Sequence, residues 1–233
     1  MLAALLVLAV TVLVLLRTQA QPRIVSNATA PARAVSPASI APQAGASGSL
    51  GDAGQDLAWT DFHGIQLPVS AHDGPRGTRS GLAWGFTDTP RGALLAAINI
   101  GVRTAALWGP DIYQPTITYE VTGPDAAALL KADSGDYAAL RAAANVPAGQ
   151  PAGRGYAVEA AYRFTAWSAS AATLDVVTEG PGSGGTTVLA VTRIEVLWQH
   201  GDWRLVAPPR GDWVNAAASI SSLTGYTTFP GEG

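Results

Sequence analysis

Four residues near the start of the folded part of the chain are of types that could bind a metal ion. His63 and His72 are each close to an aspartate, Asp61 and Asp73 respectively. Zinc takes imidazole and carboxylate ligands, but its sites keep short, fixed spacings and often include cysteine. The spacing here matches no such site, and the sequence contains no Cys. We predict that these residues belong to loops and turns, and we assign no metal site.

Two glycine-rich stretches could suggest phosphate binding or nucleophilic catalysis. The stretch 180–185 (GPGSGG) contains no Lys, and no helix pattern follows it, so we predict a hairpin turn and not a phosphate cradle. The stretch 45–49 (GASGS) lacks the last glycine of a nucleophile elbow. We therefore predict no catalytic and no cofactor-binding residues, and we expect that the protein is not an enzyme.

Charged and aromatic side chains on the predicted strands are the remaining candidates. Asp175, Glu179, Arg193 and Glu195 fall opposite the apolar stripes, which predicts ordinary charge on a solvated sheet face. Among the seven tryptophans, we expect three in the core, at Trp108, Trp198 and Trp203. Three others adjoin loops or polar faces and are candidates for contact with a partner protein, namely Trp84, Trp167 and Trp213.

The composition excludes several classes of protein. The net charge is −3 and 13% of the residues are charged, so there is no basic surface that would bind nucleic acid. Because the chain has no cysteine, it has no disulfide framework and no lipid-modified N-terminal cysteine.

The first residues form the most distinctive segment of the sequence. Residues 2–16 carry no charge and would make a helix about 22 Å long, somewhat short of the ~30 Å hydrocarbon layer. An uncleaved membrane anchor is the favoured interpretation, with a cleaved signal peptide or a buried hydrophobic helix as alternatives. A polar, Pro/Ala/Ser-rich stretch follows and cannot form a core. We expect an anchor or signal at 1–17, a tether at 18–58 and one globular domain at 59–233.

Helix signals occupy the first half of the predicted domain. Asp88 or Thr89 can cap a helix that has Pro90 in its first turn, and an apolar stripe at helical spacing follows. The chain before it is expected to be an extended lead-in over 59–69 and a loop over 72–85. Three more helices are expected: one over 110–117 interrupted at Pro115, one over 126–131, and one that starts at Ser134 or Asp136.

After residue 155 the apolar period becomes two, which is typical of strands with one buried face. Residues 156, 158, 160, 162 and 164 are expected to point inward, and Glu159, Arg163 and Thr165 outward. Further strands are expected at 174–177, 188–198 and 203–206, followed by a polar tail, 215–233, along the surface. Helices followed by hairpin-connected strands predict an α+β fold, with the strands curling around the long helix as a cone with one open end.

Several stretches resemble a known group of proteins. They are 88–93 (DTPRGA), 99–104 (NIGVRT), 175–182 (DVVTEGPG), 201–206 (GDWRLV) and 206–209 (VAPP). Together with the apolar segment and the tether, they resemble membrane-anchored proteins encoded on actinobacterial integrative and conjugative elements. That architecture is similar to the bitopic scaffold subunits of type IV secretion and conjugation machines, whose outer domain has a nuclear transport factor 2-like, cystatin-like fold.

This resemblance implies a non-enzymatic scaffold or interaction subunit of a conjugative DNA-transfer apparatus. Its partners would be the membrane, through residues 2–16, other envelope or transfer proteins, and a second copy of the chain in a homo-oligomer. The folded body is expected outside the cell membrane, or secreted if the first segment is cleaved. Two alternatives are an exported module that binds a small ligand in the mouth of the cone, and a cone-fold isomerase or hydrolase with a buried Asp or Tyr pair.

Overall fold

The computed structural model describes residues 50–182 and 185–230. They form an α+β domain with three α-helices, α2 (Pro90–Arg103), α3 (Pro110–Glu120) and α4 (Ala126–Ala144). The main sheet has the strand order β11-β6-β7-β8-β9-β5, and β10 pairs with β8 outside this path. Its strands are β5 (Val121–Thr122), β6 (Val158–Ser168), β7 (Ala171–Pro181), β8 (Thr187–Gln199), β9 (Asp202–Val206), β10 (Ala217–Ile220) and β11 (Thr227–Thr228). All of these pairings are antiparallel except that of β5 with β9.

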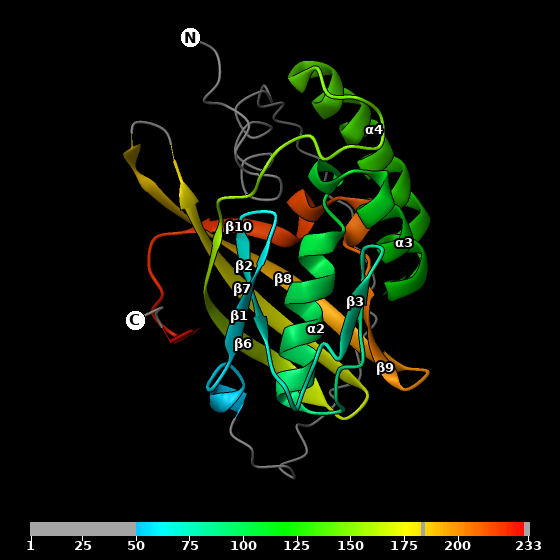
Figure 1. The fold of residues 1–233 in the computed structure, drawn as a ribbon. Coiled ribbons are helices and arrows are strands. Elements are labelled where there is room, and N and C mark those ends of the chain that lie inside the picture. The colour runs from blue at the N-terminus through cyan, green and yellow to red at the C-terminus, as the bar shows by residue number, and fades with distance from the viewer. Residues whose placement is uncertain (1–49, 183–184, 231–233) are drawn as a thin grey trace, which may run out of the picture.

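Helix α2 lies across one face of the main sheet (Figure 1) and forms the centre of the core. The helix begins as predicted, because the Thr89 side chain accepts a hydrogen bond from the Gly92 N–H and Pro90 occupies the first turn. Leu94, Leu95 and Ile98 are buried against the strands. We call the sheet face that α2 covers the inner face, and the opposite one the outer face.

Two small hairpins precede α2, where the sequence analysis expected an extended lead-in and a loop. They consist of β1 (Ala58–Phe62) with β2 (Ile65–Val69), and β3 (Gly77–Arg79) with β4 (Leu82–Trp84). Two buried carboxylates attach the second hairpin and the start of α2 to the rest of the domain. Glu120 accepts the N–H of Ala83 at 2.7 Å, and Asp202 accepts the N–H groups of Gly85 and Phe86.

The helices after α2 are longer than predicted. α3 continues through Pro115, and the residues on either side of it are held in the core. Tyr113 and Ile117 are buried, and the Thr116 hydroxyl donates to the Ile112 carbonyl and to the Gly81 carbonyl beyond the helix. The two helices expected at 126–131 and from Ser134 are the single helix α4. Ser134 does not cap a new helix there: its hydroxyl donates to the Leu130 carbonyl one turn earlier.

Both ends of the described domain pack more closely than the sequence suggested. The short 3₁₀ helix η1 (Leu50–Asp52) and the residues after it belong to the body and not to a tether, since Ala53 is buried and the Gly54 N–H donates to the Tyr162 hydroxyl at 2.8 Å. The predicted surface tail instead forms β10 and β11, which pair with the sheet. No helix within residues 50–182 and 185–230 has the length and apolar content to span a bilayer. The predicted anchor, residues 2–16, lies outside the described residues.

Candidate interaction surface on the outer face of the sheet

A charged cluster lies at the centre of the outer face. The strand register places Asp175 of β7 opposite both Arg163 of β6 and Arg193 of β8. Arg163 Nη2 donates to Asp175 Oδ2 at 2.6 Å, while Arg193 donates through Nε to Oδ1 at 2.8 Å and through Nη2 to Oδ2 at 3.2 Å. One carboxylate therefore holds two guanidinium groups in fixed positions.

Asp175 is not the solvated surface charge that the sequence predicted, because the two arginines cover it and leave it 3% exposed. Burial acts to raise the pKa of this carboxyl, but the hydrogen bonds from Arg193 and Arg163 outweigh burial and hold the pKa below its usual value. The carboxylate is thus ionised at neutral pH, and the cluster carries one net positive charge. The aromatic ring of Tyr226 lies 4.5 Å from the Arg163 guanidinium carbon, in a cation–π contact.

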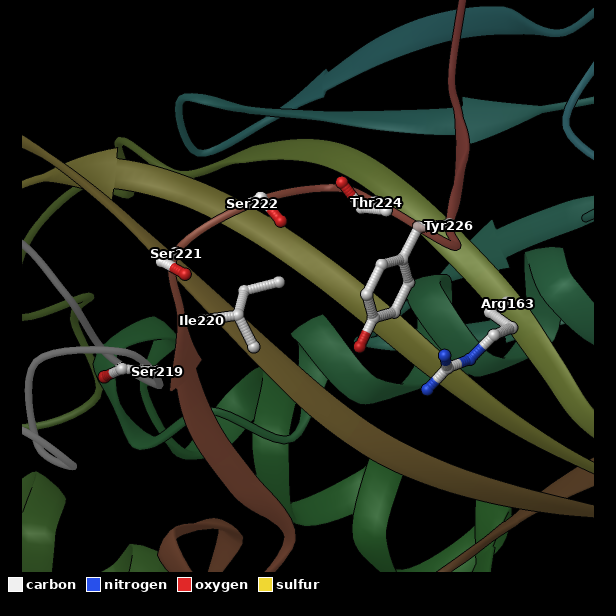
Figure 2. A pocket seen from close by; sticks show the side chains of 7 residues that line it. All are labelled: Arg163, Ser219, Ile220, Ser221, Ser222, Thr224 and Tyr226. Atoms are coloured by element: carbon white, nitrogen blue, oxygen red, sulfur yellow. The ribbon is translucent and has the colours of Figure 1, made fainter.

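The C-terminal part of the chain builds the walls around this cluster. β10 extends the sheet beside residues 189–192 of β8, and β11 pairs with residues 161–162 of β6. Residues 221–226 connect these two strands and pass across the outer face. Figure 2 shows this segment above the strands, with the Tyr226 side chain beside Arg163.

Two adjoining hollows lie between the C-terminal segment and the sheet, with volumes of about 690 and 630 Å³. They share Arg163 and Tyr226 as lining residues, so we treat them as one surface and call it the outer trough. The larger hollow has the Arg163–Asp175–Arg193 cluster and Trp213 in its lining, and the smaller one is lined mainly by residues 219–226. A hollow on a sheet face with both charged and apolar walls suits an extended polypeptide segment.

The structure does not bring the three candidate tryptophans together. Trp213, in the 3₁₀ helix η5 (Trp213–Ala216), lines the outer trough, and its Nε1 donates to Thr104 Oγ1 at 3.2 Å. Trp84 is 41% exposed on β4, where it packs over Gly77. Trp167 packs against Phe164 and Trp203 on the inner side. Of the three, only Trp213 lines the trough.

Two of the tryptophans expected in the core, Trp108 and Trp203, are buried, and the third, Trp198, is half-buried against Trp203. Of the four residues considered for a metal site, His63, His72 and Asp73 lie in turns as predicted, whereas Asp61 is an exposed residue of β1. His63 stacks on Trp108, and burial lowers the pKa of its imidazole. Asp73 accepts hydrogen bonds from the Thr87 and Thr89 hydroxyls at the start of α2. Across the described part of the chain, no group of three or more His, Cys, Asp or Glu could hold a metal ion.

Sequence analysis did not identify three buried carboxyl groups: Glu120, Asp133 and Glu159. Burial raises the pKa of each to about 8. Glu159 was expected to point outward, but a bulge between Glu159 and Ala161 adds one residue to β6 and reverses the alternation before it. Val158 consequently points to the solvent, and Glu159 points to the inner face beside α2.

Comparison with known families gives one match. A family model described as "Domain of unknown function (DUF8175)" matches residues 20–228. The chain belongs to this family. The DUF8175 match includes both the sheet and the C-terminal segment that together form the outer trough. No curated protein and no solved structure matches the chain.

Proposed function

We propose that this DUF8175 chain is a non-enzymatic, membrane-anchored scaffold or interaction subunit of a conjugative, type IV secretion-like DNA-transfer apparatus. Its folded domain would stand outside the membrane and bind an extended segment of another envelope or transfer protein in the outer trough. The α+β domain would be a member of the nuclear transport factor 2-like class, with the sheet as the cone and α2 inside it. The resemblance in sequence supports the apparatus, and the trough supports binding.

The observation that carries the proposal is the combination of an open trough with a pre-ordered floor. Asp175 already fixes both guanidinium groups, so a partner segment would meet donors whose positions are set before binding. Pre-ordered contacts reduce the loss of side-chain entropy on association. The guanidinium edges can donate to backbone carbonyl groups of a partner segment. Asp125 and Glu195 also line the larger hollow, so its charged side chains do not favour an acidic segment over a neutral one.

Mating frequency tests this proposal directly. The gene would be deleted from its mobile element and restored either as wild type or with Ala218→Trp, which places an indole at an exposed lining position of the trough. Ala166→Trp on β6 is the matched control, because Ala166 is also an exposed strand residue but does not line the trough. We expect transfer to fall at least tenfold with Ala218→Trp and to be unaffected by Ala166→Trp, at equal protein levels.

Two results would contradict the proposal at different points. If deletion of the gene leaves transfer unchanged, the protein has no role in conjugation. If deletion abolishes transfer but Ala218→Trp restores it fully, the chain acts in conjugation through a surface other than the trough.

A further inference from the structure

A small cleft between α2 and the inner face of the sheet has features of a ligand site. Its volume is about 60 Å³, and it lies on the opposite side of the sheet from the Arg163–Asp175–Arg193 cluster. Helix α2 contributes Ala97, Ile98, Gly101 and Val102, the strands contribute Glu159, Val176, Thr178, Thr192 and Ile194, and η5 contributes Trp213. Most of these side chains are apolar.

Glu159 is the exception in this lining. The residue is only 5% exposed, and its Oε2 atom accepts or donates no hydrogen bond among the described residues. A buried polar atom without a partner destabilises the fold, and when such an atom lines a cleft, a ligand can supply the missing hydrogen bond. Glu120 and Asp133 also have one such oxygen each, but neither of them lines this cleft.

The residues that line the cleft differ in their burial. Glu159, Thr192 and Ile194 are buried, whereas Gly101, Val102, Thr178 and Trp213 are only half-buried. A ligand would therefore have to reach the buried Glu159 carboxyl group past lining residues that are themselves half-buried. A cavity of about 60 Å³ holds roughly two to four non-hydrogen atoms, by comparison with the ~150 Å³ cavity that accommodates benzene.

We propose that this cleft binds the carbonyl end of a small, otherwise apolar ligand, with the Glu159 carboxylic acid donating a hydrogen bond to the carbonyl oxygen. A carbonyl oxygen needs only one donor, and the rest of the ligand end matches the apolar walls. An amine ligand would instead bring an ammonium group next to an ionised Glu159. Both charges would then have to leave water for a site with few polar groups, which costs free energy. Burial raises the pKa of Glu159 to about 8, so the acid is mainly protonated at neutral pH.

No other group in the lining titrates near this pH. The residues that face Glu159 from α2, β7, β8 and η5 are alanine, isoleucine, glycine, valine, threonine and tryptophan. A pH effect on ligand affinity in the cleft would therefore come from Glu159. The proposal does not depend on the proposed function, because the cleft and the outer trough are different surfaces that share only the Trp213 side chain.

Acetone and isobutene form a suitable pair of probes, since they have the same shape and differ by the exchange of the carbonyl oxygen for a methylene group. Their affinities would be measured from the methyl NMR signals of Val176 and Ile194 in the full-length chain. We expect the ratio of acetone to isobutene affinity to fall at least tenfold when the pH rises from 6 to 9.5, because the ionised carboxylate cannot donate.

Two variants complete the test. Glu159→Gln keeps an N–H donor, so its affinity ratio should not change between pH 6 and 9.5. Glu159→Leu removes the donor at similar size and should give the low affinity ratio at both pH values. If this variant does not fold, the comparison of the wild type with Glu159→Gln still tests the proposal.

A wild-type affinity ratio that is the same at both pH values, or absence of any acetone-induced shift, would overturn the proposal. Binding of isopropylammonium that strengthens as Glu159 ionises would assign the cleft to a cation and overturn it too.

Discussion

At the scale of single residues, Asp175 shows how a charge expected on the surface becomes structural. Its carboxylate is the common acceptor of two arginines on neighbouring strands, and it is the only member of the cluster that is buried. The side chains of Arg163 and Arg193 are 44% and 61% exposed to solvent, so each ion pair is screened and contributes little alone. The carboxylate matters because it keeps two like charges next to each other.

Replacing Asp175 by alanine should lower the free energy of unfolding by about 1–3 kcal/mol, because the buried acceptor is lost and two guanidinium groups are left adjacent. Urea denaturation measures the change. Glu179→Ala, at an exposed position of the same strand, is the control and should stay within about 0.5 kcal/mol of the wild type. Equal effects of the two substitutions would show that the cluster does not order the trough floor.

Glu159 predicts a pH dependence of stability opposite in sign to that of a carboxylate whose pKa is lowered on folding, such as Asp175. Its pKa is about 8 in the folded chain and 4.5 ordinarily, so between these values the unfolded chain loses a proton that the folded chain keeps. The contribution of Glu159 to the free energy of unfolding is therefore greatest below pH 4.5 and is lost as the pH rises to 8.

Glu159→Gln removes this contribution while it preserves size and polarity. Relative to the wild type, the variant should gain about 2–4 kcal/mol in free energy of unfolding between pH 4.5 and pH 8. Urea denaturation of both proteins at these two pH values gives the difference, in which the other titrating groups cancel. If both proteins change in parallel with pH, the Glu159 carboxyl is not buried in the neutral form.

At the scale of elements, the sequence predicted what local patterns encode. The capped start of α2, the α+β class and the positions of β6 to β9 follow from capping residues and from apolar periods, which act over a few residues. The continuous helix α4 and the pairing of β10 with β8 depend on contacts between distant segments. Neither the continuity of α4 nor the β10–β8 pairing could be predicted from the spacing of apolar residues alone.

The candidate site was less predictable than the fold, and the bulges of β6 explain part of this. A strict period of two fails where one residue is inserted, and the register of β6 shifts between Glu159 and Ala161 and again between Phe164 and Ala166. The first shift turns Glu159 inward. The second turns Trp167 toward Trp203 and away from the partner surface on which it was expected.

Helix α2 offers a direct test of the packing between helix and sheet. A methyl group added at Gly101 would lie in ordinary contact with Leu205 Cδ1 at 3.6 Å and Ile194 Cδ1 at 3.7 Å. Gly101→Ala should therefore raise the free energy of unfolding by about 0.5–1 kcal/mol, because alanine favours the helix. Thermal unfolding followed by circular dichroism measures this change.

Gly92→Ala in the same helix is the matched control. There the added methyl would collide with the Thr87 carbonyl oxygen, so this variant should be destabilised although the propensity gain is the same. A Gly101→Ala variant that is destabilised as well would mean that α2 packs more tightly on β8 and β9 than the structure indicates.

At the scale of the whole molecule, the C-terminal segment links the two sides of the sheet. It leaves β9, contacts α4 through Gly211, passes Trp213 and pairs first with β8 and then with β6. Its first part contacts the end of α2 through Trp213, and its later part, residues 219–226, lines the outer trough. The segment therefore makes the outer trough a product of distant parts of the chain, and its accessibility to a partner is the central claim of the proposed function.

Site-specific photo-crosslinking in mating donor cells tests that claim most directly. A benzophenone amino acid would replace Thr224, which lines the trough, or Tyr119, which is 66% exposed on α3 outside the trough. We predict a covalent adduct with another transfer or envelope protein from position 224 and none with that protein from position 119. Absence of any adduct at 224, or the same adduct from both positions, would contradict the assignment of the outer trough as the partner-binding surface.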